Sequence, residues 1–99
     1  MGRMKPSQAV ALHRESIRRI VASHRAHNPR VFGSALKGED SEASDLDLLV
    51  DPQEDASLFD IGAIQHELQK LLGVPVDVLT PGDLPESFRE RVVAEAAPL

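Results

Sequence analysis

The chain has 99 residues, of which 41% are hydrophobic and 27% charged, values that predict one globular domain over residues 1–99 and exclude a disordered chain. Its net charge of −5 and its lack of Trp and Tyr argue against nucleic acid as the main partner, because such binding rests on phosphate-contacting cations or on stacked bases. Without cysteine, or a segment with the apolarity of a signal peptide or membrane span, we expect a cytoplasmic protein that does not contact the membrane.

The first 32 residues predict a helix and a strand. Apolar residues recur at helical spacing over residues 6–24, which indicates an amphipathic helix. Asn28 and Pro29 are expected to end this region, because the residue before a proline avoids helical dihedral angles. Residues 30–32 then predict a short strand, since Val and Phe favour extended backbone.

The next segment predicts a turn, a loop and a second strand. Gly33 and Ser34 end the first strand, and the small, polar residues 35–44 suit a loop or a broken helical turn. Residues 44–51, SDLDLLVD, alternate with the two-residue period of a strand. Asp45 and Asp47 are therefore expected to share one face of that strand.

Residues 55–80 predict a second helix and a third strand. Asp55 is placed to cap the helix and Gly73 to end it. Apolar residues at helical spacing are expected to face the core: Leu58, Ile61, Ile64, Leu68 and Leu71 or Leu72. Residues 74–80, VPVDVLT, form the third strand.

A last helix is predicted near the end of the chain. Asp83, with Glu86 three residues later, resembles a capping box that opens a helix carrying Phe88, Val92 and Val93. The order is then helix, strand, strand, helix, strand, helix. This order predicts the α/β class, with a small sheet and flanking helices around one core.

Three aspartates are candidates for a metal site. Asp45 and Asp47 are close enough to flank a cation, and Asp77 stands in an apolar strand where a β-branched residue would be ordinary. Carboxylates this close need a cation, a basic partner or full solvation. Oxygen ligands suit Mg²⁺ or Mn²⁺, which would neutralise a triphosphate and activate an attacking hydroxyl, as in nucleotidyl transfer. The alternative is a solvated strand face, with Asp77 on the surface near a turn.

The Gly-Ser turn is a second candidate site. Gly33 lacks a side chain, so backbone N–H groups can approach phosphate oxygens closely, and the Ser34 hydroxyl adds a donor. Taken in isolation, a Gly-Ser pair is more often a plain strand-ending turn. Only its combination with the aspartates favours a phosphate site.

The combined pattern VFGSALKGEDSEASDLDLLVD, followed by VDVLT, resembles the DNA polymerase β nucleotidyltransferase superfamily. That superfamily is marked by Gly-Ser, a short spacer, Asp-x-Asp and a later third Asp, and the resemblance to its minimal nucleotidyltransferase branch extends over nearly the whole chain. It implies a polymerase-β-like fold, triphosphate binding by Gly33 and Ser34, and metal binding by the catalytic Asp45 and Asp47. It also implies that Asp77 is the third catalytic and metal-binding carboxylate and a candidate base.

One position departs from the family pattern. Members often carry Ala-Arg-Gly after the Gly-Ser turn, whereas this chain has Leu36, Lys37 and Gly38. Lys37 is therefore expected to bind the nucleotide as a point charge, with weaker phosphate pairing than the two-pronged guanidinium of Arg.

The resemblance implies transfer of AMP from ATP to a hydroxyl of a partner protein, by an antitoxin whose HEPN-domain ribonuclease toxin is modified on tyrosine. An alternative is a weak or inactive antitoxin that inhibits its partner by occlusion. Antibiotic modification is a third hypothesis and is ranked last, because the single predicted domain leaves no second domain to hold the drug. Residues 92–99 are apolar and are expected to pack against another surface. That surface is a second copy of the chain, a partner protein or the chain's own sheet, and the sequence does not choose among them.

Overall fold

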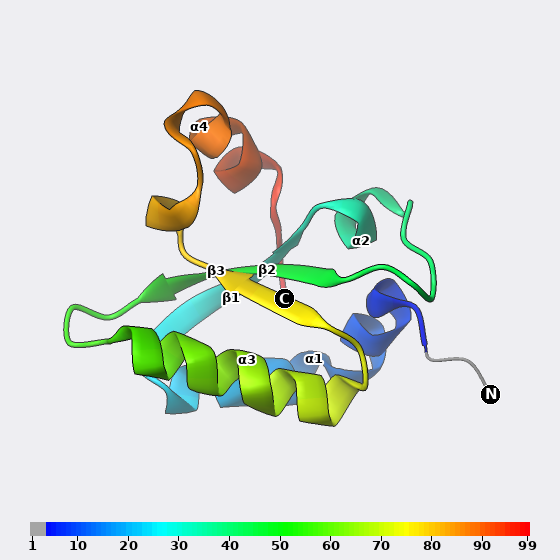
Figure 1. The fold of residues 1–99 in the computed structure, drawn as a ribbon, viewed down its shortest axis with the longest axis horizontal. Helices are drawn as coiled ribbons and strands as arrows, with labels where there is room; N and C mark the ends of the chain where they lie inside the picture. Colours follow the sequence, from blue (N-terminus) through cyan, green and yellow to red (C-terminus); the bar gives the residue numbers. More distant parts are fainter. Residues whose placement is uncertain (1–3) are drawn as a thin grey trace.

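Residues 4–99 are described here by a computed structural model of the chain (Figure 1). Residues 1–3, part of the N-terminal segment in which no signal peptide is expected, lie outside the described residues. The helices are α1 (Pro6–Ser23), α2 (Ser34–Lys37), α3 (Leu58–Leu72) and α4 (Glu86–Glu95), with a 3₁₀ turn, η1, at Pro81–Asp83. The strands are β1 (Ala26–Phe32), β2 (Leu46–Pro52), β3 (Val76–Leu79) and β4 (Ala97–Pro98). None of the helices in residues 4–99 is long and apolar enough to cross a membrane.

The strands form one mixed sheet in the order β3-β2-β1-β4. β1 is antiparallel to both β2 and β4, and β2 is parallel to β3. Helices α1 and α3 lie side by side across one face of the sheet, and α4 rises from the other (Figure 1). The predicted α/β class and the order of the six main elements are confirmed.

The hydrophobic core divides between the two faces because the side chains of β2 alternate. Leu46, Leu48 and Val50 are buried against α1 and α3, whereas Leu49 packs on the opposite face with residues near and within α4. Asp47 belongs to the same alternating set as Leu49 and so lies on the side of α4. The two-residue period therefore places the carboxylate on the face that α4 overhangs.

Helix α3 follows its predicted pattern except at its beginning. Ile64, Leu68 and Leu72 are buried, but Leu58 is 86% exposed, so its predicted inward position is wrong. Leu58 is the first helical residue and precedes the turns that pack on the sheet. Ser57, rather than Asp55, forms the capping box, with its N–H donating to Asp60 Oδ2 over 2.9 Å.

The predicted end of α3 is confirmed and the predicted start of β1 is wrong. Gly73 ends the helix with φ of 69°, a left-handed conformation that suits glycine. β1 begins at Ala26 rather than at residue 30. Asn28 and Pro29 lie within the strand at a register shift, where Asn28 has φ of 54°. Such a bulge absorbs the proline without ending the strand.

In the C-terminal region, the prediction that Asp83 and Glu86 form a capping box for the last helix is wrong, and one strand was not predicted. Asp83 closes the 3₁₀ turn by accepting the N–H of Thr80 over 2.9 Å, and α4 starts independently at Glu86. After α4, the two-residue strand β4 pairs with β1, with Ala97 opposite Val31. The apolar end of the chain thus packs on its own sheet.

Asp40 fastens the loop between α2 and β2 to the start of α1. Its side chain is buried, and its Oδ2 accepts the backbone N–H of Ser7 over 2.8 Å. Burial opposes ionisation, but the hydrogen bonds from Ser7 and the charge of Lys5 outweigh it and hold the pKa of Asp40 below its usual value. The loop that leads to Asp45 is therefore anchored by an ionised carboxylate at a helix N-terminus.

Asp40→Asn is expected to lower the free energy of unfolding by about 1 kcal/mol at pH 7, because asparagine can still accept the Ser7 N–H but brings no negative charge to the N-terminus of α1. Because the folded pKa is depressed, the contribution is present above the unfolded value near 3.8 and is lost as pH falls through the folded pKa. Urea unfolding at pH 7 and at about pH 3 measures this gap. The control is Glu54→Gln, which neutralises an exposed carboxylate, and an equal gap at both pH values would contradict the role assigned to Asp40.

Candidate active site

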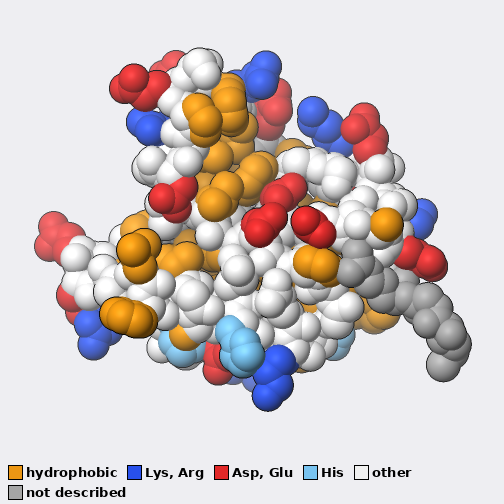
Figure 2. All heavy atoms as spheres, in the orientation of Figure 1, with side chains coloured by type: hydrophobic (Ala, Val, Ile, Leu, Met, Phe, Trp, Pro, Cys, Tyr) orange, Lys and Arg blue, Asp and Glu red, His pale blue; other side chains and the backbone are white. Residues whose placement is uncertain are grey.

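Three aspartates meet where β1 ends and β2 and β3 begin. In the sheet register Asp47 of β2 stands opposite Asp77 of β3, and Phe32, the last residue of β1, is also opposite Asp47. Asp45 directly precedes β2. Figure 2 shows a small group of acidic side chains on the surface between α4 and α2. The parallel register of β2 and β3 thus brings Asp77 next to Asp47.

These carboxylates influence one another electrostatically. Burial raises the pKa of Asp47, and the negative charges of Asp77 and then Asp45 raise it further. Asp45 and Asp77 are exposed, whereas Asp47 is half-buried. Among residues 4–99, none of the three carboxylates has a hydrogen-bond or ion-pair partner. The cluster is thus an uncompensated concentration of negative charge.

The chemistry of this cluster fits a hard divalent cation. Within residues 4–99, no group of three or more His, Asp or Glu side chains is placed to hold a metal ion as it stands. The donor set is nevertheless all carboxylate oxygen, and two of the three aspartates are exposed to solvent. Mg²⁺ and Mn²⁺ prefer such ligands when substrate oxygens complete the coordination. Asp45, Asp47 and Asp77 are the side chains that would hold such an ion.

Gly33 joins the turn to the carboxylates. Its φ of 76° and ψ of −150° belong to a backbone region that residues other than glycine rarely adopt. A Cβ built on Gly33 would collide with Oδ2 of Asp47. Glycine is therefore required here both by its backbone conformation and by the contact. The backbone of the turn lies directly against the half-buried carboxylate.

Ser34 begins the short helix α2, and Lys37 ends it. The first N–H groups of a helix have no acceptor within the helix, so this turn offers donors beside the aspartates. The Lys37 N–H returns to Gly33 O over 3.3 Å, and Gly38 closes the helix with φ of 71°. The structure thus places Gly33, Ser34 and Lys37 in one turn next to Asp47.

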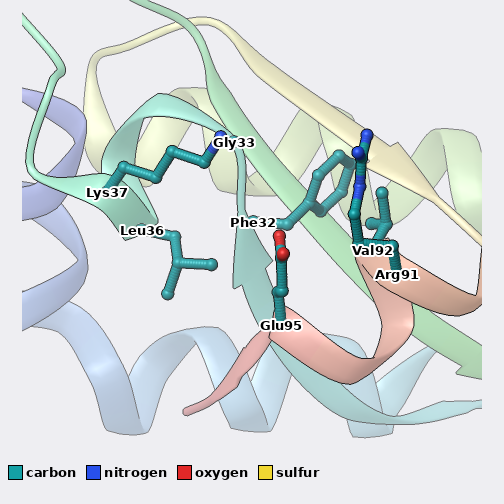
Figure 3. A pocket seen from close by; sticks show the side chains of 7 residues that line it. All are labelled: Phe32, Gly33, Leu36, Lys37, Arg91, Val92 and Glu95. Atoms are coloured by element: carbon teal, nitrogen blue, oxygen red, sulfur yellow. The ribbon is translucent and has the colours of Figure 1, made fainter. Parts of the chain in front are cut away.

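A cavity of about 250 Å³ opens beside this turn, between the end of β1, α2 and α4 (Figure 3). It is lined by Phe32, Gly33, Leu36, Lys37, Arg91, Val92 and Glu95. Lys37 extends toward Gly33, whereas Arg91 and Glu95 extend from α4 on the side of Phe32 (Figure 3). Arg91 and Glu95 were not among the predicted site residues, since no local motif distinguishes them from other charged residues of an exposed helix.

The chain is similar to proteins that act on nucleotides. A model of the nucleotidyltransferase domain matches residues 14–99. A protein of Methanocaldococcus jannaschii, provisionally described as a protein adenylyltransferase, is 36% identical over 77 residues, which cover 78% of this chain and 83% of that relative.

Two solved structures share the fold. One, provisionally described as a minimal nucleotidyltransferase, matches with a TM-score of 0.85 and 41% identity over 94% of this chain and 95% of that one. The other is a toxin–antitoxin structure with AMP-PNP, matched with a TM-score of 0.71 over 85% of this chain and 69% of that one. At 17% identity, the second likeness concerns the fold alone.

Proposed function

Because this chain belongs to the nucleotidyltransferase domain family, we propose that it transfers AMP from ATP to a hydroxyl group of a partner protein. The observation that carries the proposal is the close approach of the Gly33 backbone to the Asp47 carboxylate, which joins the proposed phosphate-binding turn to the proposed metal-binding cluster. The description of the M. jannaschii relative as a protein adenylyltransferase supports AMP as the group and protein as the acceptor.

The residues of the turn and the three aspartates have separate roles in this proposal. The backbone of Gly33 and the N–H and hydroxyl of Ser34 bind the triphosphate, and Lys37 adds positive charge. Asp45, Asp47 and Asp77 hold Mg²⁺ or Mn²⁺, which when bound neutralises phosphate charge and lowers the pKa of the attacking hydroxyl.

Asp77 is also the proposed base, because it is the exposed carboxylate on the edge strand β3, where a large acceptor can approach. It takes the proton of the acceptor hydroxyl as that oxygen bonds to the α-phosphorus. The bond from the α-phosphorus to the bridging oxygen breaks, and pyrophosphate leaves.

The proposed partner is a toxin, and the sequence resemblance points to a HEPN-domain ribonuclease. The toxin–antitoxin structure with AMP-PNP shares the fold of this chain, which supports a toxin as the partner. Occlusion without transfer is the second candidate, favoured by Lys37 in place of the usual arginine. In either case the chain would silence its partner, and only the covalent outcome differs.

Labelled ATP separates these candidates. The chain, the candidate toxin and Mg²⁺ are incubated with ATP labelled on either the α- or the γ-phosphate. We expect the toxin to retain the α label and not the γ label, because AMP is transferred and pyrophosphate released. A toxin that is inhibited without any label would support occlusion. Retention of the γ label would indicate phosphoryl transfer and contradict the proposal.

A further inference from the structure

We propose that Arg91 on α4 is a second phosphate-binding cation of this site, which acts with Lys37 on the β- and γ-phosphates of the nucleoside triphosphate. The inference rests on the proposed function and adds a residue from a helix that the Gly-Ser and aspartate motifs do not include. Both side chains line the cavity of Figure 3, which they approach from α2 and α4.

Within residues 4–99, several arginines form structural contacts, whereas Arg91 does not. Arg25 pairs with Asp55 over 3.4 Å, and Arg30 forms a buried pair with Asp51 over 3.1 Å. Arg89, on the same helix, donates to the backbone oxygen of Leu84 over 2.8 Å. Arg91 has no hydrogen-bond or ion-pair partner among residues 4–99, and neither has Lys37. Two unpaired cations therefore face one cavity in a chain whose net charge is −5.

Gly33 connects this cavity to the carboxylates. It lines the cavity, and a Cβ added to it would collide with Oδ2 of Asp47, so this one residue borders both the cavity and the carboxylate. A triphosphate that crosses the turn with its α-phosphate at Asp47 directs its terminal phosphates toward the cavity. These phosphates carry most of the negative charge and need cations there.

The chemistry of arginine explains why a second residue is useful. Lys37 offers a single ammonium group, which binds phosphate as a point charge, whereas a guanidinium presents two parallel donors to two phosphate oxygens. The family often places an arginine at the position of Lys37, and here Arg91 supplies the guanidinium from α4. The two residues together provide the charge and the fork that one arginine supplies elsewhere.

Glu95 also lines the cavity, one helical turn after Arg91. Its carboxylate repels phosphate and competes with it for Arg91, so it opposes the proposed contact. Replacing it by glutamine should leave ATP binding unweakened. This opposite expectation distinguishes a phosphate site from a cavity that merely needs its charged residues for folding.

The test is calorimetric titration of the purified chain with ATP and with AMP in Mg²⁺. Arg91→Met should weaken ATP binding by roughly tenfold, the usual effect of losing a charge-assisted contact at a solvent-accessible site, and should leave AMP binding unchanged. Arg19→Met removes the same charge from an exposed residue of α1 and is the matched control. Lys37→Arg added to Arg91→Met should restore most of the ATP affinity, and circular dichroism confirms folding.

The outcomes separate this inference from the proposed function. If the unmodified chain binds ATP and Arg91→Met binds it within twofold, or loses ATP and AMP equally, the role of Arg91 is overturned and the proposed function stands. If the unmodified chain does not bind ATP, both fail. Selective loss of ATP, rescue by Lys37→Arg and unweakened binding by Glu95→Gln together support the inference.

Discussion

Replacing Gly33 with alanine is expected to reduce nucleotidyl transfer by roughly a hundredfold or more while the chain still folds. The added Cβ would occupy the position of Asp47 Oδ2, so either the turn or the carboxylate must move. Displacement of reacting groups by about 1 Å can cost on the order of a hundredfold in rate. The backbone conformation of Gly33, which a residue with a side chain rarely adopts, adds a stability cost of about 1–3 kcal/mol, which a domain of ordinary stability tolerates.

Gly38→Ala is the matched control for Gly33→Ala. Both glycines have positive φ, 76° and 71°, but a Cβ at Gly38 meets nothing within 4 Å. Gly38→Ala should therefore lose about 1 kcal/mol of stability and keep its activity. Thermal melts and the α-labelled transfer assay measure both quantities. Equal activity in the two variants would show that the contact with Asp47 is not needed for catalysis.

Asp47→Asn is expected to impair transfer severely and at the same time to stabilise the metal-free chain. We expect activity to fall on the order of a hundredfold or more, because a proposed metal ligand is lost. Stability should rise because the half-buried carboxylate is repelled by Asp77 and Asp45, and asparagine preserves the shape without the charge. A gain in stability with a loss of function is typical of a residue retained for its chemistry.

The pH dependence of this effect has a definite sign. The folded pKa of Asp47 is raised, so its contribution to stability is fully present below the unfolded value of 3.8 and is lost as pH rises through the folded pKa. Asp47→Asn should therefore match the unmodified chain near pH 3 and exceed it at pH 7. Melts at both pH values, with and without Mg²⁺, measure this difference, and Mg²⁺ should stabilise only the unmodified chain.

Asp51→Asn, on the same strand, provides a control of opposite sign. The hydrogen bonds from Arg30 lower the pKa of Asp51 despite its partial burial, so removing that carboxylate should destabilise the chain at pH 7. If Asp47→Asn were destabilising as well, the aspartates would be structural rather than functional, and the proposed metal site would lose its support.

The sequence alone was sufficient for the element order and the family resemblance, because both depend on local patterns. The alternation around Asp45 and Asp47 and the helical spacing in α3 reflect which face each element buries. Gly73 ends its helix for a reason contained in one residue, its freedom to adopt positive φ. The bulge at Asn28 and Pro29 and the cap at Ser57 were missed, since several local conformations were open to those residues and tertiary packing selected one.

Only the tertiary structure decided how the candidate site is assembled. Asp77 faces Asp47 because β2 and β3 are parallel with that register, and Gly33 touches Asp47 because β1 returns antiparallel to β2. Arg91 reaches the cavity because β4 pairs with β1 and draws α4 back over the sheet. These contacts join residues far apart in sequence, and they are set by strand pairing and burial, which local periodicity does not specify.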